Sequence, residues 1–128
     1  MANAINQPLP GYPCTIGSKT LTVFDHYGPS SYVQYNASTG VGDIVNASDL
    51  GFGGLDQLDI FFTGYSNSGN YIVWIMMTKA NDTPAAGAGT RFTLLWWTTS
   101  SAFGPISTQA TAAANLNAEY VRLQAYVV

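Results

Sequence analysis

Residues 71–79 read Tyr-Ile-Val-Trp-Ile-Met-Met-Thr-Lys, and residues 90–98 read Thr-Arg-Phe-Thr-Leu-Leu-Trp-Trp-Thr. Both segments have the length and the content of β-branched and aromatic residues that are typical of strands. Because successive side chains of a strand point to opposite faces of the sheet, both predicted strands are apolar on both faces. One face can pack in the core of a small domain, and the other is predicted to be covered by a further surface.

Short strands of the same kind are predicted along the rest of the chain, between segments rich in Gly, Asn and Pro. They are expected at residues 20–24, 30–35, 43–45, 57–63 and 119–128. One helical turn capped by Ser48 and a short helix within residues 110–114 are the helical elements that the sequence suggests. The pattern predicts an all-β chain, an antiparallel β-sandwich or small β-barrel of about seven to eight strands.

The first residues of the chain differ from the rest in their proline content. Proline fixes φ and removes a backbone donor, so residues 1–18 are predicted to form an extended, Pro-rich N-terminal arm. A β-sandwich domain is expected over residues 19–128. The apolar side chains of Ile5, Leu9 and Tyr12 favour an arm that docks on another surface. A disordered tail is the alternative.

The composition excludes several classes of partner. Hydrophobic residues make up 47% of the chain and charged residues only 9%, whereas soluble domains carry about 25% charged residues. The chain has four Lys and Arg residues, scattered along its length. Nucleic-acid binding and polybasic membrane binding need several cations on one surface. We therefore expect neither a nucleic acid nor a membrane as a partner.

The cysteine content and the first residues of the chain indicate the cellular compartment in which the protein is made. The single cysteine excludes an intrachain disulfide, and secreted domains of this size often carry cysteine pairs. The opening sequence Met-Ala-Asn-Ala-Ile-Asn-Gln-Pro lacks the basic and apolar regions of a signal peptide. We expect the protein to be made and assembled in a cytoplasm.

Residues with catalytic or metal-binding chemistry are few and scattered. The lone histidine, His26, lies beside an aspartate and near two serines, but a catalytic triad is set by geometry and not by sequence neighbours. We expect a turn histidine that makes local hydrogen bonds, and a shielded thiol at Cys14. Asp43, Asp49 and Asp56 lack the spacing of a calcium-binding loop and are expected to be solvated. The sequence predicts no enzyme activity, no metal and no cofactor.

The second apolar face of the two long strands is the strongest candidate for a functional surface. Trp74, Met76, Leu95 and Trp97 share this face, and an apolar patch of that size usually marks an interface between proteins. We therefore predict that the chain forms an oligomer through these residues. The alternative is that the arm, or the long polar connection over residues 100–117, covers this face within one chain.

Several stretches of the chain carry a resemblance to a known class of protein. They read Gly42-Asp-Ile-Val-Asn-Ala-Ser-Asp-Leu-Gly, then Leu-Asp-Gln-Leu-Asp, then Ser68-Gly-Asn-Tyr-Ile-Val, then Phe92-Thr-Leu-Leu-Trp-Trp and Leu116-Asn-Ala-Glu-Tyr-Val-Arg-Leu-Gln-Ala. Over residues 20–128 the chain resembles the small β-rich head decoration (cement) proteins that are encoded beside the major capsid protein in many tailed bacteriophages. Leu94-Leu95 stands where that pattern often has a charged residue.

The resemblance implies a structural protein of the virion that binds the outside of the phage head, commonly as a trimer, and stabilises it. It implies the major capsid protein as the partner, which the N-terminal arm would reach. Another virion component, such as a tail or head–tail joining protein, is the first alternative. A carbohydrate-binding β-sandwich is the second, because the chain is rich in tryptophan, tyrosine, asparagine and glutamine.

Overall fold

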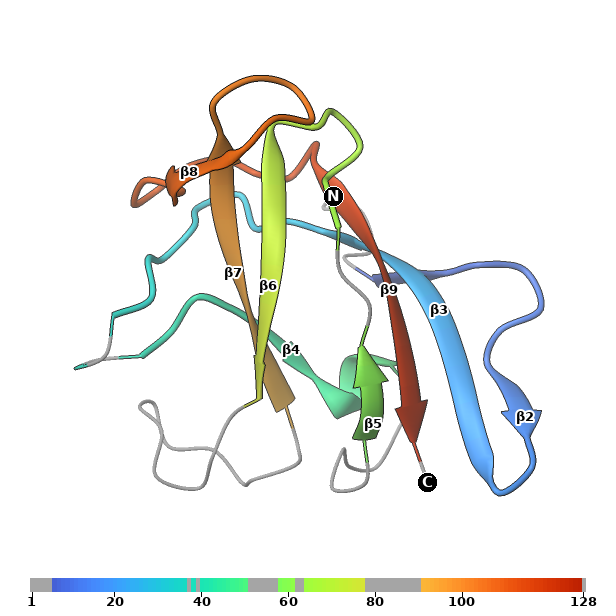
Figure 1. Ribbon diagram of the computed structural model, residues 1–128. Coiled ribbons are helices and arrows are strands. Elements are labelled where there is room, and N and C mark those ends of the chain that lie inside the picture. The colour runs from blue at the N-terminus through green and yellow to red at the C-terminus, as the bar shows by residue number, and fades with distance from the viewer. Residues whose placement is uncertain are drawn as a thin grey trace.

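The computed structural model describes residues 6–36, 38, 40–50, 58–61, 64–77 and 91–127, which form two antiparallel sheets (Figure 1). The first sheet consists of β1 (Asn6–Pro8), β2 (Cys14–Ile16), β3 (Lys19–Tyr27), β5 (Leu58–Phe61) and β9 (Tyr120–Val127). The second sheet consists of β4 (Asp43–Asn46), β6 (Tyr71–Met77), β7 (Arg91–Thr99) and β8 (Ile106–Gln109). The predicted all-β sandwich is therefore confirmed. In the described part of the chain no helix is long and apolar enough to cross a membrane.

In each sheet one strand pairs with three others: β3 in the first sheet and β7 in the second. In the first sheet the order is β1-β3-β9-β5, and β2 also pairs with β3. In the second sheet the order is β4-β7-β6, and β8 also pairs with β7. The two longest ladders are β3 with β9, from Thr20 opposite Val127 to Tyr27 opposite Tyr120, and β6 with β7. Each sheet is therefore organised around one long pair of strands.

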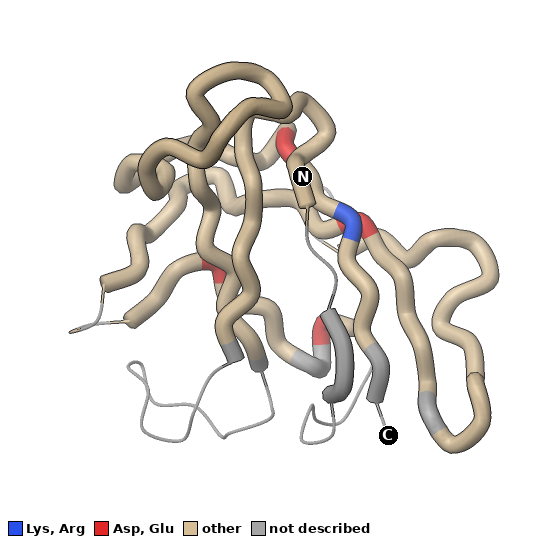
Figure 2. The backbone as a smooth tube through the Cα atoms, viewed as in Figure 1, with Lys and Arg blue, Asp and Glu red and all other residues tan. Residues whose placement is uncertain are grey.

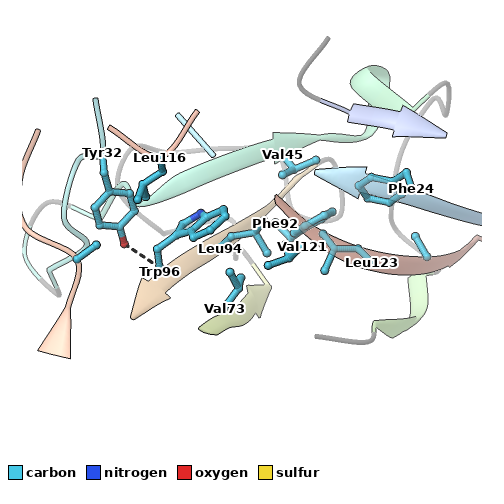
Figure 3. Close-up of a cluster of buried hydrophobic side chains, with 12 residues drawn as sticks. Phe24, Tyr32, Val45, Val73, Phe92, Leu94, Trp96, Leu116, Val121 and Leu123 are labelled. Atoms are coloured by element: carbon cyan, nitrogen blue, oxygen red, sulfur yellow. Dashed lines mark hydrogen bonds between the residues drawn. The ribbon is translucent and has the colours of Figure 1, made fainter. Parts of the chain in front are cut away.

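The core lies between the two sheets and is built from alternate residues of the strands (Figure 3). The side chains that are at most 1% exposed include Phe24, Val45, Val73, Phe92, Leu94, Trp96, Val121, Leu123 and Ala125. Burying a large apolar side chain of this kind stabilises the fold by about 1.5–3 kcal/mol. The inward position of Trp96 and the outward position of Trp97 agree with the alternation predicted for residues 90–98.

The strand predicted at residues 30–35 is not formed, and this prediction is wrong. These residues are irregular, and single backbone hydrogen bonds tie Tyr32 to Ala113 and Ala114 at 2.7 and 2.9 Å. Tyr32 is 1% exposed and closes one end of the core (Figure 3), whereas its neighbour Val33 is 52% exposed. One buried aromatic side chain accounts for the apolar pattern here without a continuous ladder.

The two predicted helical details also differ from the structure. No helix forms within residues 110–114: the N–H of Ala110 donates to the oxygen of Trp96 at 2.8 Å and prolongs the pairing of β8 with β7. A run of five residues is too short to nucleate a helix alone. The predicted turn exists as the 3₁₀ helix η1 (Ala47–Leu50), but Ser48 lies inside it, and Asn46 occupies the cap position.

The N-terminal arm is extended and pairs with its own domain over the residues that the structure describes. β1 and β2 both pair with β3, and the N–H of Leu9 donates to the oxygen of Val23 at 2.9 Å. Leu9 and Tyr12 are half-buried, and Ile5 lies outside the described residues. A contact of these three side chains with another subunit stays a prediction.

Candidate functional site

The outer surface of the second sheet carries a largely apolar face, in which Thr93 lies opposite Met76. It is formed by Ile72, Trp74, Met76, Leu95 and Trp97, and we call it the Trp74 face. In the ladder of β6 and β7, Trp74 lies opposite Leu95, and Ile72 lies opposite Trp97. The indole rings of Trp74 and Trp97 are 4.9 Å apart between centroids and are tilted by 44°. The structure thus brings together the four residues of β6 and β7 that the sequence predicted for an interface.

Exposure is uneven across the Trp74 face. Trp74 is 52% exposed, whereas Leu95, its partner in the ladder, is 9% exposed. The buried Nε1 of Trp97 has no hydrogen-bond partner among the described residues. A buried donor without an acceptor costs about 1–3 kcal/mol. Trp74 is the side chain of this face that offers the most surface to a partner.

Charged side chains are lacking on the Trp74 face within the described residues. β6 contains none, and the one charged residue in the sequence of β7 is Arg91 at its first position; over residues 92–99 there is none, and Figure 2 draws this part tan. Asp43 of the neighbouring β4 is directed into the sandwich, where its carboxylate, 10% exposed, is paired with Trp96 and His26. The prediction that Asp43 is a solvated acid is therefore wrong. The charged pair Arg122 and Asp25, joined at 2.9 and 3.1 Å, lies on the first sheet. Over Tyr71–Met77 and residues 92–99 the two strands carry no charged residue.

His26 is not the turn histidine that was predicted. It lies within β3, is 1% exposed and makes non-local contacts. Its Nδ1 is 2.7 Å from Oδ1 of Asn6, and its Nε2 is 2.6 Å from Oδ2 of Asp43. The Nε1 of Trp96 donates to the same Asp43 oxygen at 2.9 Å. The prediction failed because it ended the strand at Phe24. β3 continues to Tyr27, and the turn begins only at Gly28-Pro29.

This polar cluster is structural in character. It links β1, β3, β4 and β7, and so it joins the two sheets. A general base needs a nitrogen that can reach a substrate, but both ring nitrogens of His26 are engaged within the chain and the residue is buried. A signal in the sequence was available: Thr22, Phe24 and His26 alternate on the face of β3 that turns out to be buried.

Tyr32 forms a second buried polar connection. Its hydroxyl donates to Oε1 of Gln109 at 2.8 Å and accepts from the backbone N–H of Trp96 at 3.3 Å. Burial raises the pKa of the Tyr32 phenol to about 12; the Trp96 hydrogen bond opposes this shift and the negative charge of Asp43 adds to it. The phenol is therefore held neutral in the folded protein.

The high pKa of Tyr32 leads to a testable pH dependence. In the unfolded chain a tyrosine loses its proton at about pH 10, whereas the folded protein keeps it until about pH 12. The unfolded state binds fewer protons in this interval, so the free energy of unfolding falls as the pH rises, by about 2 kcal/mol in total. Urea unfolding of wild type and Tyr32→Phe, at several pH values from about 9 upward, measures this contribution. As the pH rises, wild type should lose stability relative to Tyr32→Phe. A difference between the two proteins that does not change with pH would contradict the raised pKa of Tyr32.

The remaining candidates from the sequence do not form a site. Cys14 is a half-buried free thiol in β2, and Asp49 is exposed, with its carboxylate accepting from the N–H of Asn46 at 3.3 Å. Asp56 lies outside the described residues. In the part of the chain that the structure covers, no three His, Cys, Asp or Glu side chains are grouped as a metal site would require.

Comparisons of the chain with protein-family models, with curated proteins and with solved structures found no match.

Proposed function

We propose that the protein is a structural component of a virus particle: a decoration protein that associates with copies of itself through the Trp74 face and binds the outside of a capsid. The observation that carries the proposal is an apolar, uncharged sheet face with a half-exposed tryptophan at its centre. The resemblance of residues 20–128 to phage head decoration proteins supports the same function.

The energetics favour an extended contact. An indole side chain buries on the order of 200 Å², so covering the exposed half of Trp74 would remove about 100 Å² from water and contribute about 2.5 kcal/mol. Association itself costs at least about 4 kcal/mol in lost freedom of motion. Trp74 alone is insufficient, and the neighbouring side chains Ile72 and Met76, which are half-buried, supply the rest.

The distribution of charge permits a second copy of the chain at the Trp74 face. Each chain carries a net charge of −3, so identical copies repel one another at long range. This repulsion is smallest where the facing surfaces carry no charge, which is the case for the described Trp74 face. Self-associating chains form closed, symmetric oligomers in most cases. We propose a trimer because the resemblance to head decoration proteins implies one. Binding only to the assembled shell would then stabilise that shell by mass action.

Light scattering at micromolar concentration is the first test. A trimer has a mass of about 41 kDa, three times the 13.6 kDa of one chain. A monomer at this concentration would refute self-association. The second test is co-sedimentation with empty shells assembled from the major capsid protein of the virus to which the chain is proposed to belong. Saturable binding is expected. Rings or polymers without shell binding would favour a tail or head–tail joining component.

A carbohydrate-binding module is the second candidate, because Trp74 is exposed enough to stack on a sugar ring. The 44° tilt between Trp74 and Trp97 argues against a flat platform for several sugar units. Quenching of tryptophan fluorescence by soluble oligosaccharides, abolished in Trp74→Ala, is the result that would favour this candidate.

A further inference from the structure

We draw no further inference here: the strongest candidate, the exposed aromatic pair of Phe103 and Tyr65 beside the turn between β7 and β8, carries none because nothing in the structure shows what covers it.

Discussion

Trp74→Glu is expected to convert the oligomer into a monomer at micromolar concentration. The substitution removes the most exposed apolar side chain of the Trp74 face and places a carboxylate where a partner would bury it without a counter-charge. An unpaired buried charge at an interface costs several kcal/mol, so the dissociation constant should rise by about a hundredfold or more. Light scattering across a dilution series measures the change.

Val33→Glu is the matched control for this experiment. Val33 is 52% exposed, the same fraction as Trp74, and the substitution adds the same charge. It should leave the mass of the oligomer unchanged. Because Trp74 is half-exposed in the single chain, Trp74→Glu should also keep a folded sandwich, which circular dichroism verifies. A Trp74→Glu protein with the wild-type mass would exclude this face as the interface.

Asp43→Ala is expected to cause the largest loss of stability. Its Oδ2 accepts from the Nε1 of Trp96 at 2.9 Å and lies 2.6 Å from the Nε2 of His26, both of which are buried. Removing the carboxylate leaves these groups without an acceptor between the two sheets. The free energy of unfolding should fall by about 3–5 kcal/mol, measured by urea unfolding.

Two further variants make the Asp43 result interpretable. Asp49→Ala removes an exposed carboxylate from the next turn and should cost at most about 1 kcal/mol. Asp43→Asn keeps one oxygen acceptor and should lie between wild type and Asp43→Ala. Equal stability of Asp43→Ala and Asp49→Ala would mean that the polar cluster contributes nothing to joining the sheets.

The long strands and their faces could be predicted because the pattern of residues within each segment is sufficient to assign them. Alternating large apolar residues in residues 71–79 and 90–98 determine which side chains share a face, and the structure places Trp96 in the core and Trp74 on the outside accordingly. Trp74 is 52% exposed, so neither the described part of the arm nor residues 100–117 cover it fully, and self-association through this face stays a prediction.

The structural features that the sequence did not predict depend on hydrogen bonds to residues far away in the chain. Residues 30–35 have strand-like composition, but their hydrogen bonds run to an irregular loop some eighty positions later in the chain, so no ladder forms. The short strand β8 exists because β7 offers it an edge, which composition does not reveal. Phe103 could have been noticed as an aromatic residue between Ala102 and Gly104 in a turn, where burial is unusual.

The pairing of β3 with β9 joins the start of the described chain to its end, with Thr20 opposite Val127. During synthesis β3 has no partner on that side until β9, about a hundred residues later, has been made. Contacts this far apart in sequence make folding slow, because a long loop must close before they form. The first sheet is therefore completed late in folding, because its central pair joins two segments about a hundred residues apart. Loss of β9 by truncation would leave β3 with an unpaired edge, which is a template for aggregation.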